Sequence, residues 1–409
     1  MALKPQYICL DIGTTKVTML AAAFDDKAVE SGGVTVVAHA SSPCRGLSRG
    51  MVVDIDATVA SICEVVKTLK QSTKSMCRDV LVSLSGHHVQ AMRSHGIVAV
   101  GQGEIHQSDV DRVIEAAKAV AVPANRTILH VLPQEYVVDD QSGVENPIGM
   151  VGVRLEVKVL IVTCSNSALQ NIVRCVERSG LRVQQIVLAQ LASSAAVLSS
   201  DEKNLGVCVL DMGGGTTDIA IYTKGVIQHA SVVAIAGDHV TNDIAMALRT
   251  PPNCAERLKL EHGIASASCL QREQMIEVPG LTAAAPRSIS SAELLEVVGA
   301  RYHEIFSFVA QELTRQGFHD SIPGGVVLTG GAAKVMGVKT IATQVLGHSV
   351  RVAQPVLEGM ASGLHDPACA TVVGMLLHGS QSRASMSRWR AGRLTKMWRS
   401  MQLWLEQHL

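Results

Sequence analysis

Apolar runs alternate with helical patterns along the chain, which predicts an α/β fold. The stretch QYICLDIG has the pattern of a buried strand that ends in a glycine turn, and TKVTMLAAAF that of the strand returning beside it. Apolar positions at helical spacing predict one helix beginning at Asp56 and another capped by Ser108. The small, polar stretch 379–387 predicts a flexible linker.

The second half of the chain repeats the opening of the first. The stretch LGVCVLDMGGG is again a strand entering a glycine turn, and TTDIAIYTKG is its return strand. Asp11 and Asp211 therefore occupy equivalent places, each ending an apolar strand before a Gly/Thr turn. The pattern predicts an internal duplication with two lobes.

Composition bounds the classes of function. The 409 residues are 47% hydrophobic, which is enough for two cores, and the formal net charge is zero. A neutral chain offers no bulk field for nucleic acid, so we predict no nucleic-acid partner. The ten cysteines show no CxxC pairs and are expected to be reduced and mostly buried. No signal peptide and no membrane-spanning run are expected.

Three glycine turns are the candidates for chemistry: DIGTTKV, DMGGGTTD and TGGAAKV. Successive backbone N–H groups in such turns form concave anion sites, threonine hydroxyls add donors, and a double glycine before a helix can receive a phosphate or an adenosine. A nucleotide held between two lobes is therefore expected. The residues predicted to hold it are Asp11, Gly13, Thr14, Thr15, Lys16, Asp211, Gly213, Gly214, Gly215, Thr216, Thr217, Gly330 and Gly331.

Asp11 and Asp211 are expected to face each other across the cleft, with Mg²⁺ between them and the phosphates, held largely through water. Each glycine turn by itself is equally typical of an ordinary hairpin, and only the combination favours a nucleotide site. A P-loop is excluded because the chain has no Gly-Lys dipeptide. GLSRG (46–50) matches a nucleophile-elbow pattern around Ser48, but its flanks favour a loop.

All three tryptophans lie in the last twenty-one residues, in WRAGRLTKMWRSMQLWLEQHL. On a helical projection, one arc of residues 394–409 is apolar and basic residues lie outside it. This pattern is typical of a helix lying in a membrane interface, although a helix docked on the protein itself stays open from the tail alone. The predicted membrane-contacting residues are Leu394, Met397, Trp398, Met401, Trp404 and Leu405.

The three glycine motifs resemble the phosphate and adenosine motifs of the actin-like ATPase superfamily. The stretches SSPCRGLSRGMVVD, LHVLPQEYVVDD, VENPIGMVGVRLEVKV and LASSAAVL narrow this resemblance to the family of the bacterial cell-division protein FtsA, over essentially the whole chain. The resemblance implies an actin-like two-lobed ATPase fold with duplicated core domains and a family-specific 1C insertion.

The resemblance also implies domain boundaries. Subdomain 1A is expected at 1–84 and 165–198, and an inserted, SHS2-like subdomain 1C at 85–164. Subdomain 2A is expected at 199–239 and 311–379, subdomain 2B at 240–310, a linker at 380–387 and an amphipathic membrane-targeting helix at 388–409.

Several site residues are implied by the resemblance alone. Gly237 resembles an additional phosphate-side turn, and Glu256 and Lys259 belong to a stretch that resembles the segment contacting adenosine. Spacing alone favours a solvated amphipathic helix for this stretch. Gln190 falls where the superfamily places a glutamine that positions water for ATP hydrolysis, though it could equally be a buried polar residue. Any turnover is expected to be slow.

The implied partners are the C-terminal peptide of FtsZ, further copies of this chain, lipids of the cytoplasmic membrane and other division proteins. Arg287, Arg301 and Glu304 match the FtsZ-binding region, although Arg301 and Glu304 could instead form only a surface ion pair. The resemblance implies a peripheral protein on the cytoplasmic face of the membrane at the division site. The alternative is a small-molecule kinase of the same superfamily.

Overall fold

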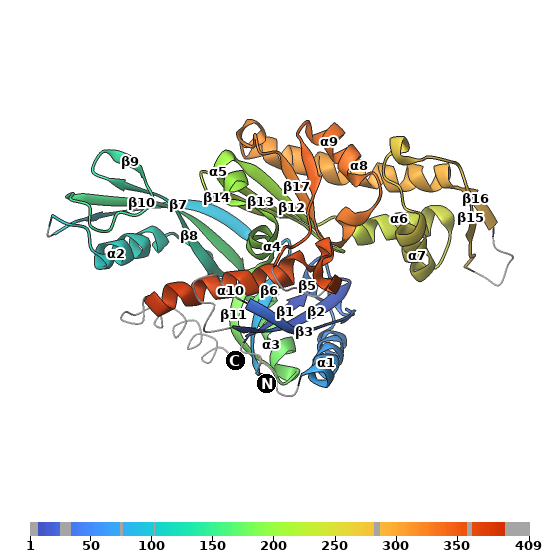
Figure 1. Cartoon of the computed structure of the whole chain (residues 1–409), viewed down its shortest axis with the longest axis horizontal. Coiled ribbons are helices and arrows are strands. Elements are labelled where there is room, and N and C mark those ends of the chain that lie inside the picture. Colours follow the sequence, from blue (N-terminus) through green and yellow to red (C-terminus); the bar gives the residue numbers. More distant parts are fainter. Residues whose placement is uncertain are drawn as a thin grey trace.

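Two sheets and the helices around them form the centre of the molecule, with one smaller group of elements on either side (Figure 1). The structure is a computed structural model. It describes residues 7–24, 34–73, 77–101, 103–281, 287–357 and 362–388.

The two central sheets have the same topology, strand for strand. The first has the order β11-β6-β1-β2-β3 and the second the order β14-β13-β12-β17-β18. In each, the opening strand pairs antiparallel with the next strand of the chain on one side and parallel with a later strand on the other. The first sheet contains β1 (Tyr7–Ile12), β2 (Lys16–Phe24), β3 (Val34–Pro43), β6 (Asp79–Leu84) and β11 (Arg182–Leu188). The second contains β12 (Val207–Met212), β13 (Thr217–Thr223), β14 (Val226–Val233), β17 (Val326–Thr329) and β18 (Val350–Val352). The predicted duplication is confirmed.

Strand β12 is buried on both faces, which explains its unbroken apolar sequence. Val207 and Val209 belong to the core shared with the first lobe, whereas Cys208 and Leu210 belong to the core of the second lobe. This alternation follows from the period of two in a strand.

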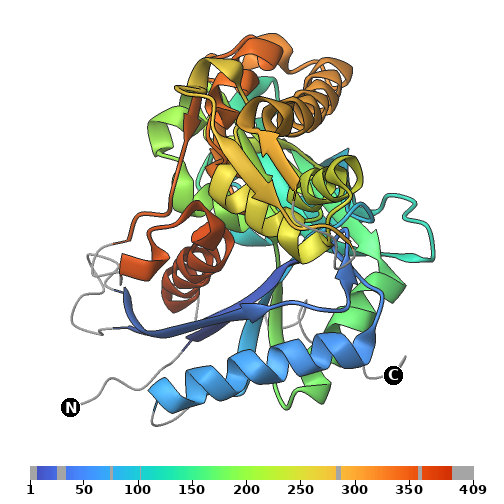
Figure 2. The same cartoon turned by 90° about the vertical axis from the view of Figure 1, so that its right-hand side faces the viewer.

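Two helices lie between the sheets, α4 (Ala189–Val197) and α10 (Ala370–Arg388). Their backbones approach so closely that a methyl group on Gly374 would overlap the carbonyl oxygen of Ala192. On the outer face of the first sheet lie α1 (Ile55–Ser72) and α3 (Asn166–Arg178), as Figure 2 shows for α1. The second sheet packs its other face against α6 (Gly237–Leu248), α8 (Ser291–Arg315) and α9 (Val338–Leu346). The short helix α5 (Ser200–Leu205) leads into β12.

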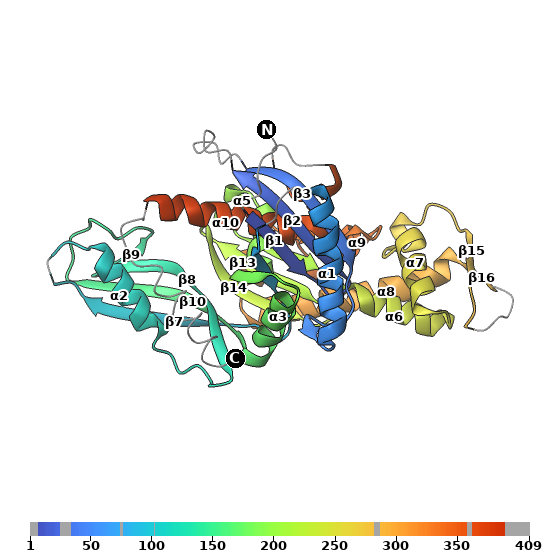
Figure 3. The same cartoon turned by 90° about the horizontal axis from the view of Figure 1, so that it is seen from below.

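A separate sheet with the order β7-β10-β8-β9 is inserted after the first lobe begins (Figure 3). Its elements are β7 (Gln90–Ala99), α2 (Gln107–Lys118), β8 (Arg126–Val138), β9 (Gln141–Val144) and β10 (Arg154–Ser165). One face of β10 packs in the core with α2, and Leu160 and Val162 on its other face join the core of the first lobe. The insertion is therefore anchored to the first lobe by apolar packing.

At the opposite end of the molecule, α7 (Pro252–His262) and the hairpin of β15 (Met275–Val278) and β16 (Arg287–Ser290) lie beside α6 and α8 (Figure 1). A small hairpin of β4 (Leu47–Ser48) and β5 (Met51–Val52) follows β3. It contains the GLSRG motif, for which the sequence favoured a loop.

Three local expectations need correction. The first helix begins at Ile55 with Asp54 as its cap, and the helix expected from Ser108 begins at Gln107, because the Asp109 carboxylate accepts from the backbone N–H of His106. The stretch 379–387, predicted as a flexible linker, continues helix α10. Extending a packed helix needs no new nucleation, and this stretch contains no proline.

The domain boundaries stay predictions, and the predicted membrane-contacting residues lie outside the described residues. Among the helices that the structure describes, none is long and apolar enough to cross a bilayer.

Candidate functional site

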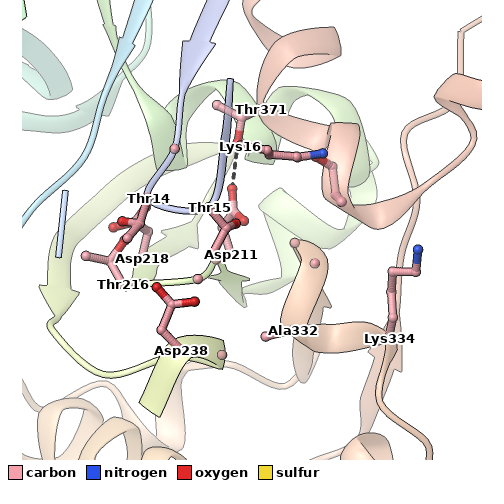
Figure 4. A pocket seen from close by; sticks show the side chains of 18 of the residues that line it. Thr14, Thr15, Lys16, Asp211, Thr216, Asp218, Asp238, Ala332, Lys334 and Thr371 are labelled. Carbon is pink, nitrogen blue, oxygen red and sulfur yellow. Dashed lines mark hydrogen bonds between the residues drawn. The ribbon is translucent and has the colours of Figure 1, made fainter. Parts of the chain in front are cut away.

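A cavity of about 660 Å³ lies between the two lobes, at the ends of the strands where both chain halves make their glycine turns. Elements distant in sequence converge on it, as the side chains in Figure 4 show. Of the residues predicted to hold a nucleotide, the following line it: Asp11, Gly13, Thr14, Thr15, Lys16, Asp211, Gly213, Gly214, Gly215, Thr216, Gly237, Glu256, Lys259, Gly330 and Gly331.

The two duplicated turns have matching backbone geometry. The N–H of Gly13 donates to the carbonyl of Lys16 at 2.9 Å, and the N–H of Gly213 donates to the carbonyl of Thr216 at the same distance. The lobes meet at these turns. A methyl group on Gly215 would lie 2.5 Å from Thr14 Oγ1, so the second turn can approach the first only without a side chain.

The turns also present unused hydrogen-bond donors. Within the part of the chain that the structure describes, the backbone N–H groups of Thr14, Thr15, Gly214 and Gly215 donate to no protein acceptor. Two such pairs facing one cavity form an anion site of the kind that cradles phosphates. The donor set of the cavity therefore fits a polyphosphate.

The third turn follows β17. Gly330 has φ +85°, and a methyl group there would lie 2.5 Å from Asp211 Oδ1, so only glycine fits. The expected helix start is a short 3₁₀ helix, Gly331–Lys334, on the side of the cavity away from Thr14 (Figure 4).

Each lysine that lines the cavity is held by a protein acceptor. Lys16 Nζ donates to the carbonyl of Ala368 at 2.7 Å. Lys259 Nζ donates to the carbonyl of Gly237 at 3.0 Å and to Thr241 Oγ1 at 2.8 Å. Lys259 is also ion-paired at 2.7 Å with Glu256, which accepts a hydrogen bond from the Thr241 hydroxyl. Glu256 and Lys259 thus fix the junction of α6 and α7 at the edge of the cavity.

Three carboxyl groups lie at the base of the cavity, those of Asp211 and Asp218 buried and that of Asp11 half-buried, and each accepts a hydrogen bond from a hydroxyl. Ser83 donates to Asp11 at 2.6 Å, Thr371 to Asp211 at 2.8 Å, and Ser85 to Asp218 at 2.6 Å. The last of these bonds joins the first lobe to the second.

Burial is the main cause of the raised pKa values of these carboxyl groups. It raises the pKa of Asp211 to about 6, with a smaller contribution from the charge of Asp11, and raises the pKa of Asp218 well above its ordinary value. The pKa of Asp11 is also raised, against the lowering effects of Ser83 and Lys16. A bound cation would relieve the repulsion among these groups, so the site fits Mg²⁺. Among the described residues, no three acidic, histidine or cysteine side chains are arranged to ligate a metal directly.

Sequence reasoning missed several polar groups of this site, among them Asp218, Ser83, Ser85 and Thr371. Asp218 had a detectable signal, because a tight hairpin pairs it with Asp211 across β12 and β13, whereas the equivalent partner of Asp11 is Thr18. Ser83 lies in β6, Ser85 directly follows that strand and Thr371 lies in α10, and nothing local marked them.

Some predicted site residues lie away from the cavity. Thr217 is fully buried and its hydroxyl donates to the carbonyl of Ile235 at 2.8 Å. Gln190 is also fully buried, and among the described residues its side-chain amide group has no hydrogen-bond partner. Its neighbour Ala189 lines the cavity, but Gln190 does not. Its catalytic role stays a prediction.

Arg301 and Glu304 lie on α8 and Arg287 on β16, remote from the cavity. Arg301 forms an ion pair with Glu304, as the sequence allowed, and a second, two-pronged pair with Asp243 on α6 at 2.5 and 2.8 Å. Its guanidinium is therefore already engaged between two helices.

Solved structures share this arrangement of two lobes around a cleft. The PilM-PilN type IV pilus biogenesis complex matches with a TM-score of 0.64 and 17% identity, over 92% of this chain and 98% of that chain. The structure of MreB5 of Spiroplasma citri bound to ADP matches with a TM-score of 0.58 and 15% identity, over 94% and 98%. The fold is that of the two-lobed, actin-like class of proteins.

The sequence relatives narrow this class to one family. The family model described as "Cell division protein FtsA" matches residues 208–374, and that of the "SHS2 domain inserted in FTSA" matches residues 86–163. Curated relatives named Cell division protein FtsA are 45% identical in Pseudomonas aeruginosa, over 92% of this chain and 89% of theirs, and 39% identical in Escherichia coli K12, over 91% and 90%. The chain belongs to the FtsA family of cell-division proteins.

The close approach of the two turns generates a prediction. In Gly215→Ala, the added methyl group overlaps Thr14 Oγ1 and the backbone of Arg49, which separates the turns. We expect Mg²⁺-ATP affinity to fall at least about tenfold, as expected when a positioned donor pair is lost. Isothermal titration of the full chain measures this, with Gly101→Ala as control because its methyl group would meet nothing within 4 Å. Unchanged affinity in Gly215→Ala would show that no ligand depends on this contact.

Proposed function

We propose that the interlobe cleft binds ATP with Mg²⁺. The observation that carries this proposal is the pair of facing glycine turns, with four N–H donors that have no protein acceptor among the described residues, beside three carboxyl groups with raised pKa values. The N–H groups and Lys16 suit the phosphates, and Asp11 and Asp211 suit a hydrated cation. Glu256, Lys259, Gly330 and Gly331 would lie at the adenosine end. Two structures of MreB5, which have a similar fold, hold ADP and AMPPNP, and this similarity supports nucleotide binding in the cleft.

The bound nucleotide would join the two lobes, because each lobe contributes one of the facing turns. Mg²⁺ would supply charge neutralisation of the phosphates and of the carboxyl groups. Any hydrolysis is proposed to be slow, since Gln190 does not reach the cavity in this conformation. The site would then serve mainly to fix the relative position of the lobes.

We further propose that the protein tethers FtsZ polymers to the inner face of the cytoplasmic membrane at the division site, self-associates and helps to recruit later division proteins. Membership in the FtsA family over nine tenths of the chain supports a role in division. The amphipathic sequence after Arg388 supports peripheral attachment to lipid. A single helix of this kind binds reversibly, so firm attachment would need several tails in one polymer.

The alternative, a small-molecule kinase of the same superfamily, has less support. A kinase needs a cleft base for a substrate hydroxyl. The buried carboxyl groups already accept hydrogen bonds from Ser83, Thr371 and Ser85, and the basic amphipathic tail would have no role.

Membrane attachment is tested with the tail. Replacing both Trp398 and Trp404 with glutamate puts charges on the apolar arc, so we expect the full-length variant to lose flotation with vesicles containing phosphatidylglycerol. Wild type should float, and a chain ending at Arg388, which keeps helix α10 whole, should not. Mg²⁺-ATP affinity should be unchanged in both variants. Flotation of the shortened chain equal to wild type would place the lipid-binding surface elsewhere.

The FtsZ site is tested best at Arg287, because Arg301 is engaged with Asp243 and its replacement would disturb the packing of α6 and α8. Arg287 is exposed, and Arg287→Glu reverses its charge. We expect affinity for a synthetic FtsZ C-terminal peptide, followed by fluorescence anisotropy, to fall about tenfold through loss of a charge-assisted contact. The control is Arg257→Glu, an exposed arginine on α7. Equal loss in both variants would indicate a general charge effect, and no loss in Arg287→Glu would remove Arg287 from the site.

A further inference from the structure

The hairpin of β4 and β5, residues 47–52, lies against the glycine turn of the opposite lobe. It belongs to the first lobe, yet the Cα and N atoms of Arg49 lie 3.0 Å from the position that a methyl group on Gly215 would occupy. The N–H of Gly50 donates to Thr14 Oγ1 at 3.3 Å, and Gly50 lines the cavity. Gly50 is therefore part of the cavity wall, and the backbone of Arg49 lies beside it, next to the second glycine turn.

Arginine is an unfavourable residue at the tip of this hairpin. Strands β4 and β5 pair Ser48 with Met51, so Arg49 and Gly50 form a two-residue loop, with φ values of +50° and +75°. A loop with both residues in the left-handed region favours Asn-Gly or Gly-Gly, because a Cβ atom is strained there. Strain of this kind at the edge of a cavity indicates that the side chain has a role other than forming the turn.

The side chain of Arg49 is exposed, and within the part of the chain that the structure describes its guanidinium has no ion pair or hydrogen bond. The positive charge of Arg49 also contributes, after burial, to the lowered pKa of His239 in the first turn of α6. This effect places the charge of Arg49 near the first turn of α6, in which Gly237 and Asp238 line the cavity.

The side chains that line the cavity carry more negative than positive charge, so a bound polyphosphate would gain from a further cation. Six acidic side chains line it, Asp11, Asp211, Asp218, Asp238, Glu256 and Glu261, against three lysines. The lysines are all engaged: Lys16 with Ala368, Lys259 with Glu256, and Lys334 with Asp366. A polyphosphate entering this cavity therefore gains from a further cation that has no protein partner to give up.

The position of the hairpin also decides which phosphate it would meet. Figure 4 shows Thr14 and Thr216 on one side of the cavity and Ala332 and Lys334 on the other. The hairpin lies over Thr14 and Gly215, at the end away from the 331–334 turn where the adenosine is proposed to lie. A group at that end is close to the last phosphate of a bound nucleotide.

We propose that Arg49 binds the terminal phosphate of a nucleoside triphosphate in the cleft and thereby distinguishes a triphosphate from a diphosphate. This inference rests on the proposed nucleotide site. Because Arg49 comes from the first lobe and contacts the turn of the second, its engagement with the terminal phosphate would also hold the lobes together in the triphosphate state only.

The test compares Mg²⁺-ATP with Mg²⁺-ADP by isothermal titration of the full chain. In Arg49→Ala, ATP affinity is expected to fall about tenfold or more, as for loss of one charge-assisted hydrogen bond, while ADP affinity changes by less than about twofold. Arg49→Gly should show the same loss for ATP with an equal or higher melting temperature, because glycine relieves the positive φ. Arg45→Ala removes an exposed cation four residues away and should leave both affinities unchanged.

The possible outcomes separate this inference from the function on which it rests. If wild type binds neither nucleotide, the proposed nucleotide site itself is wrong. If wild type binds both and Arg49→Ala loses neither, or loses both equally, Arg49 does not read the terminal phosphate. Equal loss of ATP affinity in Arg45→Ala would show that the loss comes from the change in overall positive charge and not from a contact of Arg49, which would overturn the proposal. A change confined to self-association, measured by light scattering, would assign Arg49 to a contact between copies and overturn the proposal.

Discussion

The structure depends on one close approach, that of the two duplicated glycine turns. Gly214 and Gly215 lie against Thr15 and Thr14 with no space for a side chain between them. This contact sets the distance between the lobes and brings to one cavity the N–H groups of four residues, which have no protein acceptor among the described residues. The helices α4 and α10 maintain it from behind, where Gly374 permits equally close packing against Ala192.

The same approach concentrates negative charge. Asp11, Asp211 and Asp218 are brought together in a buried space, where hydroxyl donors stabilise them only in part and burial keeps their pKa values raised. Bringing these carboxyl groups together costs electrostatic free energy, which a cation bound among them would lower. This cost provides a physical reason why a ligand, rather than packing alone, would control how the lobes are held.

The sequence predicted those features of the fold and of the site that depend on a few neighbouring residues. Apolar strands that end in Asp-x-Gly turns revealed the duplication, because both the period of two and the glycine requirement are visible in a few residues. The pairing of Asp218 with Asp211 was also accessible, from the register of a tight hairpin. Ser83, Ser85 and Thr371 were not, because they reach the site from strands and helices that only the tertiary fold brings near.

The sequence was misread where tertiary packing, rather than local composition, determines the structure. The stretch 379–387 looks like a linker alone, but it extends a helix whose first half is buried between the sheets. Arg301 looked available for a partner, but Asp243, distant in sequence, engages it. The role predicted for Arg301 in the FtsZ-binding region stays a prediction.

The central claim, that a nucleotide with Mg²⁺ joins the two turns, is tested most directly by hydrogen–deuterium exchange of the full chain with and without Mg²⁺-ATP. The free amides of Thr14, Thr15, Gly214 and Gly215 should exchange rapidly without ligand and become protected together when it binds. Protection of only one turn, or of neither, would contradict the claim that the ligand bridges the lobes.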